Sequence, residues 1–569
     1  MSDMMEKSQQ FTTRRSANYE ASAWGHDFVQ SLKSDYAEEN HTRRSEKLKE
    51  KVRIMFADQV CRGSLSSTLK LIDGIQRLGV SYHFDGEIRA SLDTINKKNY
   101  VWEKDDLFTR ALRFRLLRQH RYEVSQDVFK RLIMAEMMNT SSACDNDMEG
   151  ILSVYEASFY AFEGEDVLDE AQKLTTKILK EYLLSSANDQ ENCNCITERF
   201  VRHALELPFQ WIAPRVDARW YIDTYEMMQD TDPVLLEFAK LDFNILQAKY
   251  QDELKHISRW WKGLGCIEIL SFSRNRFVEM FVWTVWCNFE PEFDICRAEL
   301  TKFGALATLL DDTYDVYGTL DELNMFTDAV ERWDVNKMVD LPDYMKLLFL
   351  AVYNTTNAIA YEVLKKRSLD ILPYLKKVWA DFCNAYLLEA KWYYSGYTPT
   401  FEEYMDNGWV SASGYLMPTY AYFLEGNEIT KEGLECLKNR SSDLVRYSLM
   451  ISRLLDDLQT SSHEQERGDT PKSIECYMHQ TGVTEAIARE HIKHMIHDLW
   501  KKMNGDEYTR SIFPRQFVDF VQNYARGCHC IYQFKDWYGG NAGPEMKNRV
   551  ISLLAKPIPI KKILVKCLT

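Results

Sequence analysis

The stretch LLDDTYDVY (residues 309–317) brings three carboxylates, Asp311, Asp312 and Asp315, to the end of an apolar run. On a helix, Asp311 and Asp315 would project from one face, one turn apart, while Asp312 would point about 100° away. Like charges on one face repel each other, so we expect a cation to face them. Because no His or Cys lies nearby, these oxygen ligands favour Mg²⁺ or Mn²⁺, and a solvated helix end is the alternative for this motif alone.

A second row of oxygen ligands occurs in RLLDDLQTSSHEQERGD (residues 453–469). Asp456, Thr460 and Glu464 fall at i, i+4 and i+8, so a helix would align two carboxylates and a hydroxyl along one face. This is again a set of ligands for a hard cation, although a polar helix face is the alternative. The two rows together predict facing walls of one metal site.

Positively charged and aromatic residues complete the predicted site. Mg²⁺ held by a few carboxylates usually completes its shell with water and phosphate oxygens. Arg453, Arg274 and Arg276 can hold such phosphates, although each arginine alone is more often a surface residue. Aromatic residues, 13% of the chain, can line a pocket below. Such a pocket suits the removal of diphosphate from a hydrocarbon, with ring faces stabilising the carbocation.

Helical patterns extend over nearly the whole chain and would position these residues. The stretch LFTRALRFRLLRQHRYEV (residues 107–124) has a broad apolar face, as an amphipathic helix requires. Thr400 and Glu403 form a capping-box pattern, and residues 469–471 predict another helix start. Strand-like alternation is nearly absent, so we predict an all-α fold.

The length of 569 residues exceeds what a single hydrophobic core covers, so we expect at least two domains. We expect a boundary between the acidic MMQDTDPV (residues 227–234) and the helix that contains SRWWKGLG (residues 258–265). The predicted domains are residues 1–235 and 236–569. All the carboxylate motifs lie in the second.

Charge and composition limit the binding partners and the subcellular location of the protein. A net charge of −15 argues against a general attraction to nucleic acid or anionic membranes, and no run of 18 apolar residues predicts a membrane span. The first 16 residues fit neither a secretory signal nor a transit peptide, so we expect a cytoplasmic protein. The 13 cysteines are scattered and are interpreted as mostly reduced core residues. The pairs Cys193/Cys195 and Cys528/Cys530 lack the usual spacing of a zinc site.

These motifs resemble those of plant terpene synthases of the two-domain, class I kind, over essentially the full chain. The family's D-D-x-x-D is residues 311–315, and its second metal motif, [ND]-D-x-x-[ST]-x-x-x-E, is residues 456–464 with Asp457 as its second position. The R-x-R motif is Arg274 and Arg276. The N-terminal R-R-x₈-W motif is Arg14, Arg15 and Trp24.

The resemblance implies an N-terminal helical, barrel-like domain and a C-terminal class I helical bundle, which would act as a monomer on a small prenyl diphosphate. It implies three Mg²⁺ ions, or Mn²⁺, two of them on Asp311 and Asp315 and the third on Asp456, Thr460 and Glu464. The catalytic and substrate-binding residues that it implies are Arg274, Arg276, Arg453, Asp312, Trp283, Tyr532 and Asp536. Asp536 and Tyr538 would belong to the segment that closes the pocket, and Arg14, Arg15 and Trp24 to an N-terminal strand that caps it.

The sequence departs from the family pattern at three positions. Asn275 replaces an Asp, and Trp286 and Trp537 each replace a Gly. These changes leave the ligands untouched but alter the pocket or its lid, so they bear on the product rather than on ionisation. No D-x-D-D motif occurs, so a protonation-initiated, class II reaction is not expected.

The length of the substrate chain rests on two further arguments. A cytoplasmic address favours farnesyl diphosphate (C15), and Ser452 stands where isoprene-forming members of the family carry a pocket-shortening Phe. We therefore expect loss of a proton from the farnesyl cation to give a sesquiterpene, acyclic and farnesene-like. The alternative is a monoterpene synthase that uses geranyl diphosphate, because the R-R-x₈-W motif is closer to monoterpene, isoprene and farnesene producers. A prenyl transferase, which would carry a second D-D-x-x-D, and a non-catalytic helical interaction protein are more distant alternatives.

Overall fold

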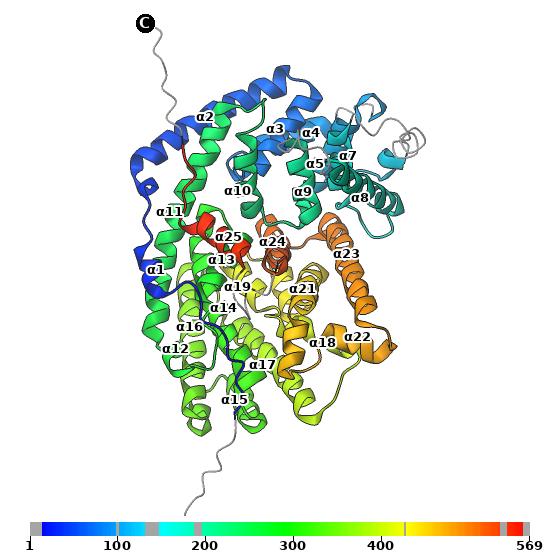
Figure 1. Ribbon diagram of the computed structural model, residues 1–569. Helices are drawn as coiled ribbons and strands as arrows, with labels where there is room; N and C mark the ends of the chain where they lie inside the picture. The colour runs from blue at the N-terminus through cyan, green and yellow to red at the C-terminus, as the bar shows by residue number, and fades with distance from the viewer. Residues whose placement is uncertain are drawn as a thin grey trace, which may run out of the picture.

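The computed structural model describes residues 14–97, 102–130, 147–186, 196–425, 428–534, 537 and 543–560. Within these ranges the chain forms helices joined by loops and contains no strand, which confirms the predicted all-α fold. Figure 1 shows two helical units, one above the other, with the long helix α11 running through both.

The helices before α11 are α1 (His26–Ser31), α2 (Glu39–Arg62), α3 (Leu65–Arg77), α4 (Asp85–Lys97), α5 (Leu107–Gln119), α7 (Met148–Ser158), α8 (Asp166–Ser186), α9 (Ile196–Glu206) and α10 (Pro214–Tyr225). Those from α11 onward are α11 (Pro233–Leu264), α12 (Cys266–Ile269), α13 (Phe277–Cys287), α14 (Asp294–Asp312), α15 (Leu320–Arg332), α16 (Asp343–Arg367), α17 (Leu372–Ser395), α18 (Phe401–Ser411), α19 (Leu416–Leu424), α20 (Lys431–Asn439), α21 (Asp443–Arg467), α22 (Ser473–Thr481), α23 (Glu485–Arg510), α24 (Arg515–Tyr532) and α25 (Pro544–Leu554). Short 3₁₀-helices are η1 (Asp35–Ala37), η2 (Ser81–His83), η3 (Trp102–Lys104), η4 (Phe209–Trp211), η5 (Pro291–Phe293) and η7 (Val335–Asp340), and η6 (Thr313–Tyr317) is a π-helix.

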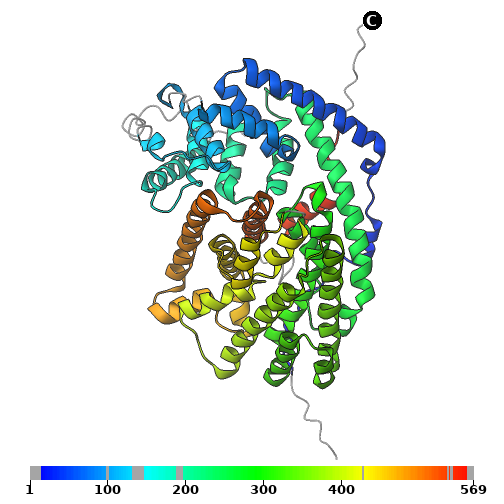
Figure 2. The ribbon, with the colours of Figure 1, turned by 180° about the vertical axis from the view of Figure 1, so that it is seen from behind.

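Two large hydrophobic cores correspond to the two units. The first is formed mainly by α2 to α5, α7, α8, α10 and the first part of α11. The second is formed by the helices from α13 onward with the later part of α11, and contains large buried rings such as Phe303, Trp379 and Tyr420. Figure 2 shows the same division from behind, with the first unit at the top. A separate core in each unit is what two domains require.

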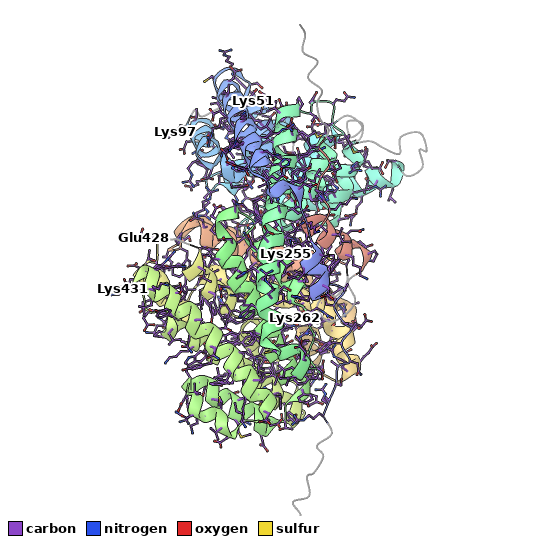
Figure 3. The ribbon with its side chains drawn as sticks, turned by 90° about the vertical axis from the view of Figure 1, so that its left-hand side faces the viewer. Lys51, Lys97, Lys255, Lys262, Glu428 and Lys431 are labelled. Carbon is purple, nitrogen blue, oxygen red and sulfur yellow. The ribbon has the colours of Figure 1, made fainter. Side chains whose placement is uncertain are left out.

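Helix α11 is shared by both cores and links the two units. It starts at the N-cap Asp232, whose side chain accepts hydrogen bonds from two backbone amides of the first turn. Residues up to Phe243 pack in the first core and those from Leu246 in the second. Figure 3 shows this helix along the side of the molecule that faces the viewer, with Lys255 and Lys262 on it. We therefore propose that the domain boundary lies near residue 245 of α11, later than residue 235.

Each end of the described chain packs in the core of the unit at the other end of the sequence. Trp24, Val29 and Leu32 are buried in the second core. At the other end, Ile558 is buried in the first core, where its backbone exchanges hydrogen bonds of 2.7 and 2.9 Å with the side chain of Asn244. Figure 1 shows the segment before α1, in dark blue, running down across the second unit. The N-terminal residues therefore lie on the unit that carries the carboxylate motifs.

Two local predictions are confirmed and one helix start is displaced. The capping box at Thr400 and Glu403 begins α18. The helix predicted over residues 107–124 forms as α5, but it ends at Gln119, and its consecutive buried residues 111–118 cover all of its faces instead of one. The helix expected at residues 469–471 begins at Ser473 instead. Asp469 lies outside the helix, and its carboxylate is ion-paired with Arg15 at 2.5 Å.

Helix α16 is long and apolar enough to cross a membrane by length and composition, a feature that counting consecutive apolar residues did not reveal. In the structure, α16 packs against α14 and α17. Its buried residues include Met345, Leu348 and Val352, which belong to the second core. The apolar composition of α16 is therefore used in packing the bundle.

A buried carboxylic acid in the second unit predicts a pH-dependent stability. Glu425 accepts a hydrogen bond of 2.9 Å from the Asn288 side chain, and burial raises the pKa of Glu425 from 4.5 to about 8. The folded protein thus holds one more proton at this site than the unfolded chain between these values. The stabilising contribution of this proton is complete below pH 4.5. Between pH 4.5 and 8 the free energy of unfolding falls by at most about 1.4 kcal/mol per pH unit, and the contribution is lost once the pH has risen through 8.

We expect the Glu425→Gln variant to lose less stability than the wild type when the pH is raised from 6 to 9. Its amide oxygen can still accept the hydrogen bond from Asn288, but the group does not titrate. The measurement is Tm against pH, with exposed Glu432→Gln as the matched control. Parallel Tm curves for the wild type and Glu425→Gln would show that Glu425 is not protonated in the folded protein.

Candidate active site

The second unit contains a cavity of about 170 Å³ lined by residues of α13, α14, α17, α19, α21 and α24. It is the place where the residues singled out by their spacing come together. The predicted residues that line it are Asp311, Asp315, Asp456, Thr460, Glu464, Arg274, Arg453, Trp283 and Tyr532.

The first carboxylate wall lies where α14 passes into a π-helix. Helix α14 ends at Asp312, and in the π-helix η6 the amide of Gly318 donates to the carbonyl oxygen of Thr313 at 2.8 Å. The sequence predicts a regular α-helix here, whereas this hydrogen bond spans five residues and widens the turn. Asp311 and Asp315 nevertheless line the same cavity. π-Helical turns of this kind are frequent at functional sites.

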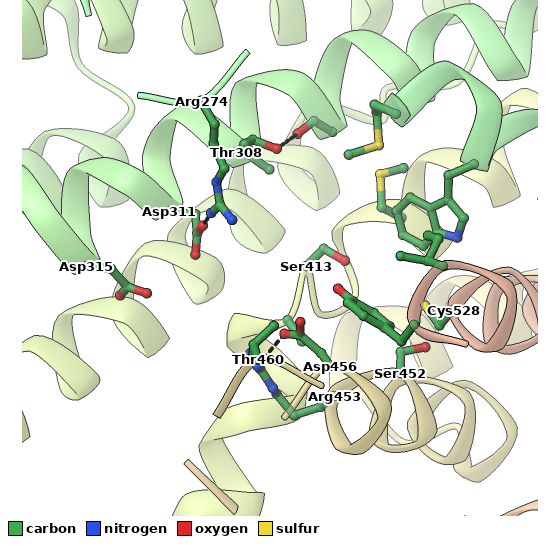
Figure 4. Close-up of a pocket in the computed structure, with 18 of the residues that line it drawn as sticks. Arg274, Thr308, Asp311, Asp315, Ser413, Ser452, Arg453, Asp456, Thr460 and Cys528 are labelled. Carbon is green, nitrogen blue, oxygen red and sulfur yellow. Dashed lines mark hydrogen bonds and ion pairs between the residues drawn. The ribbon is translucent and has the colours of Figure 1, made fainter. Parts of the chain in front are cut away.

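Helix α21 carries the second wall. Figure 4 shows Asp456 and Thr460 across the cavity from Asp311 and Asp315, and Glu464 continues the row by one turn. In the part of the chain that the structure describes, no three His, Cys, Asp or Glu side chains converge on one point. The carboxylates and the hydroxyl of Thr460 therefore stand on two separate walls. This arrangement suits Mg²⁺, which keeps few protein ligands and completes its shell with water and phosphate oxygens.

Two oxygens of the second wall have unused bonding capacity. Thr460 Oγ1 and Glu464 Oε2 are buried and have no hydrogen-bond partner among the described residues. Desolvation raises the pKa of Glu464 to about 8 and that of Asp315 to about 6. A desolvated carboxylate gains strongly from a nearby cation. The donor set and its unsatisfied oxygens therefore fit divalent ions of the Mg²⁺ type.

Arg274 and Arg453 border the two walls. Arg274 is ion-paired with Asp311 and, at 2.9 Å, with the fully buried Asp312. Asp312 also accepts a hydrogen bond of 2.8 Å from the backbone amide of Arg274, so it supports this arginine instead of lining the cavity. Arg453 is held at 2.5 Å by the buried Asp457. Both guanidinium groups are thus fixed at the edge of the cavity, where they can bind an anion bidentately.

Arg276, which the resemblance implies as catalytic, does not line the cavity. It is the N-cap residue of α13, and its guanidinium donates to the carbonyl oxygen of Glu20 at 3.0 Å. Glu20 belongs to the segment of residues 14–25, called the N-terminal segment below. Arg276 therefore holds the N-terminal segment, and its contribution to the site is indirect.

The N-terminal segment reaches the edge of the cavity. Arg14 forms an ion pair with α15, and Arg15 donates to the backbone oxygen of Asp315 at 3.0 Å. Tyr19 lines the cavity, with its ring centroid 4.9 Å from the guanidinium carbon of Arg274. The R-R-x₈-W motif indicated the two arginines but not Tyr19. The sequence feature that could have indicated Tyr19 is its position between the two arginines and Trp24.

Lys472 is a cationic group of the site that the motifs did not reveal. It lines the cavity, is 4% exposed, and donates to Glu389 Oε2 at 2.9 Å. Burial alone lowers the pKa of Lys472, but the carboxylates of Glu389, Asp315 and Glu464 raise it well above its ordinary value. Lys472 is therefore charged and interacts with both walls. No motif marks it, and its position just after the second ligand row is the available signal.

Aromatic and apolar side chains form the remaining lining. Trp283 and Tyr532 lie there as predicted, together with Phe382 and Tyr524. The rings of Trp283 and Tyr524 pack with centroids 4.6 Å apart. The cavity therefore joins a charged end, with carboxylates and cations, to ring faces that can stabilise a carbocation.

Two of the departures from the family pattern pack against each other away from the cavity. Trp286 and Trp537 are each 1% exposed, their ring centroids are 5.9 Å apart, and neither lines the cavity. Asn275 accepts a hydrogen bond from the indole of a nearby tryptophan. Asp536 and Tyr538, predicted on the closing segment, lie outside the described residues.

The C-x-C pair Cys528/Cys530 lies on α24. Cys528 lines the cavity, and His529 accepts a hydrogen bond of 2.9 Å from the indole of Trp500. Cys193 and Cys195 lie outside the described residues.

Family models match both units of the chain. The model described as "Terpene synthase, N-terminal domain" matches residues 23–205. The model described as "Terpene synthase family, metal binding domain" matches residues 262–502. The second match contains both carboxylate walls, Arg274 and Lys472.

Relatives align over almost the whole chain. Terpene synthase 10 of Ricinus communis is 49% identical over 551 residues, which are 96% of this chain and 98% of that protein. Myrcene synthase, chloroplastic, of Quercus ilex is 47% identical over 553 residues, which are 96% of this chain and 90% of that protein. The chloroplastic name of this relative contradicts the cytoplasmic location expected from the first residues, so that prediction is wrong.

Two solved structures share the fold and contain diphosphate compounds. Limonene synthase with 2-fluorolinalyl diphosphate has a TM-score of 0.90 and 38% identity, covering 96% of this chain and 100% of that chain. Isoprene synthase from grey poplar leaves, in complex with three Mg²⁺ ions and dimethylallyl-S-thiolodiphosphate, has a TM-score of 0.83 and 41% identity, covering 95% and 99%. Together with the family models, these matches show that the chain belongs to the terpene synthase family and is a two-domain, metal-binding lyase.

Proposed function

We propose that the protein is a monoterpene synthase that converts geranyl diphosphate into a C10 hydrocarbon in an Mg²⁺-dependent reaction. The observation that carries this proposal is the cavity itself, in which two walls of oxygen ligands stand beside cationic groups and aromatic rings. The C10 chain length is supported by the names of similar proteins, which include a myrcene and a limonene synthase. The chloroplastic name of the myrcene synthase supports a plastid address.

We assign the metal ligands as the resemblance implies, two ions on Asp311 and Asp315 and a third on Asp456, Thr460 and Glu464. A solved relative with three Mg²⁺ ions supports this number. When bound, these ions supply charge neutralisation of the departing diphosphate. The chain contributes the oxygens that hold the ions on two facing walls.

The cationic side chains of this protein would hold the diphosphate before and after it leaves. Arg274, Arg453 and Lys472 border the cavity from three different segments. The arginines offer planar pairs of N–H donors, while the lysine offers a compact charge between the walls. Each is fixed by a carboxylate, so little reorganisation is needed when the anion binds.

The aromatic lining and the N-terminal segment would protect the cation. Trp283, Phe382, Tyr524 and Tyr532 present apolar faces to the hydrocarbon chain, and cation–π contacts stabilise positive charge. The N-terminal segment places Tyr19 at the cavity and so limits access of water. We propose that the protein acts as a monomer.

Farnesyl diphosphate is the second candidate substrate, with an acyclic, farnesene-like sesquiterpene as product. Two observations favour it: Ser452 is a small side chain in the lining, and the ring of Trp286, which would take depth from the pocket if it pointed inward, does not line the cavity. The argument from a cytoplasmic address no longer supports C15. The names of the relatives weigh more, and we therefore place C10 first.

The experiment that separates the two substrates is a comparison of kcat/KM for geranyl and farnesyl diphosphate, with products identified by gas chromatography and mass spectrometry. We expect kcat/KM to be higher for geranyl diphosphate by about tenfold or more, because apolar pockets discriminate between substrates by the length of the apolar chain that they can accommodate. A clear preference for farnesyl diphosphate would replace the monoterpene proposal by the sesquiterpene one.

Replacing Glu464 by Gln tests the second metal wall. The amide keeps an oxygen at the site but removes the negative charge, so we expect the Mg²⁺ concentration for half-maximal turnover to rise by about tenfold or more. The measurement is a Mg²⁺ titration of steady-state turnover. Glu466→Gln, two residues further along the same helix and exposed, is the matched control. An identical titration for Glu464→Gln and the wild type would remove Glu464 from the metal ligands.

A further inference from the structure

Gly527 lies in the interior of α24, the helix that brings Tyr524, Cys528 and Tyr532 to the cavity. Its φ is not positive, so an alanine could adopt the same backbone conformation. Glycine in a helix interior is less favourable than alanine because it loses more backbone freedom on folding. The helix itself therefore gives no reason for a glycine, and the reason lies in what surrounds it.

The surrounding group is the indole of Trp283. A Cβ atom at position 527 would lie 2.6 Å from Nε1 and 2.8 Å from Cδ1 of this ring, and the next atom, Cys287 Sγ, is 3.9 Å away. Atoms of an aromatic ring cannot yield individually, so the whole indole would have to move. The missing side chain at position 527 thus makes room for one specific ring.

The ring of Trp283 borders the cavity, so a displacement of the ring would change the space there. Trp283 is 6% exposed, lines the cavity, and packs on Tyr524 of the same helix α24. Its Nε1 has no hydrogen-bond partner in the described parts of the chain, so packing alone fixes the depth of the ring. Contact with the bare backbone of Gly527 is part of that packing.

We propose that Gly527 is a positioning residue that sets how far the indole of Trp283 projects into the cavity, and thereby which product the carbocation gives. This inference rests on the proposed function, in which a hydrocarbon cation is held against ring faces. A cation–π contact depends on the distance between the charge and the ring, so a shifted indole would favour a different position of the charge along the hydrocarbon chain.

The test is a double-mutant cycle with Gly527→Ala, Trp283→Phe and the combined variant, read by product distribution and by Tm. In Gly527→Ala we expect the ratio of the two main products to change by about threefold or more and Tm to fall. The Trp283→Phe background lacks the five-membered ring that meets the new methyl group. In this background we expect Gly527→Ala to leave the product ratio unchanged and not to lower Tm. Equal effects of the alanine in both backgrounds would overturn the proposal.

The matched control is Gly74→Ala in helix α3, because a Cβ there meets no atom within 4 Å. We expect this variant to keep the product ratio and to keep or raise Tm. If Gly527→Ala alone does not fold, the combined variant is expected to fold, and failure of both to fold would overturn the proposal.

The two proposals fail in different ways. A folded wild-type protein that releases no diphosphate refutes the proposed function, whereas the Tm coupling between positions 283 and 527 still tests the contact. An active wild type whose product ratio is the same in Gly527→Ala refutes only the role of Gly527.

Discussion

Asp311→Ala is expected to lower kcat/KM by at least about a thousandfold, roughly 4 kcal/mol of transition-state stabilisation. The change removes a carboxylate of the first wall that we propose as a metal ligand. It also removes one of the two carboxylates beside Arg274, but that arginine keeps its pair with Asp312, so the fold should persist. Turnover is measured with geranyl diphosphate at saturating Mg²⁺, and folding by circular dichroism.

The control for Asp311→Ala is Asp321→Ala, which removes an exposed aspartate of α15. This variant should retain turnover within about twofold of the wild type, since surface substitutions are usually small in effect. Wild-type turnover in Asp311→Ala itself would show that this carboxylate is not needed. It would also contradict the assignment of the first wall as a metal-binding wall.

Arg453→Lys is expected to lower kcat/KM by about a hundredfold with the fold preserved. Arg453 is ion-paired with both Asp456 and Asp457, so its guanidinium is held beside the second wall. Lysine keeps the positive charge but not the planar fork of donors that binds a phosphate bidentately. The loss should therefore appear with an intact helical spectrum.

Arg446→Lys is the matched control, because Arg446 lies on the same helix, is exposed and pairs with Asp443. We expect no more than about a twofold change there. If Arg453→Lys changed turnover as little as Arg446→Lys does, Arg453 would not belong to the diphosphate site.

The carboxylate walls could be predicted from the sequence because helical spacing alone puts such residues on one face. Asp456, Thr460 and Glu464 needed no knowledge of other segments, and α21 presents all three to the cavity. The π-helix at Asp315 could not be predicted in this way. The same residues satisfy an α or a π turn locally, and the choice depends on packing around them.

Residues that act through distant contacts were the ones that sequence reasoning missed or misplaced. Lys472 and Glu389 are far apart in the chain and form their ion pair only after α17 and the start of α22 come together. Arg276 matched a motif beside Arg274, yet it holds the N-terminal segment by a hydrogen bond to Glu20. A motif names residues in order along the chain, whereas their roles follow from what each side chain contacts.

The wrong prediction of a cytoplasmic address has a different cause. The prediction of location rests on the first residues. Receptors in the cell recognise targeting signals independently of the residues that form a cavity. Nothing in the carboxylate walls or in Trp283 could have corrected it. The preference for farnesyl diphosphate rested on that location together with Ser452. Without the location, the names of the relatives outweigh Ser452, so the order of the two substrates changed while the ionisation chemistry did not.

The most direct test of the central claim is to incubate the purified protein with geranyl diphosphate, first in EDTA and then after addition of excess Mg²⁺, and to quantify diphosphate and hydrocarbon together. We predict neither product in EDTA and equimolar diphosphate and C10 hydrocarbon once Mg²⁺ is present. A correctly folded protein that forms no C10 hydrocarbon with Mg²⁺, or that forms it equally well in EDTA, would contradict the account.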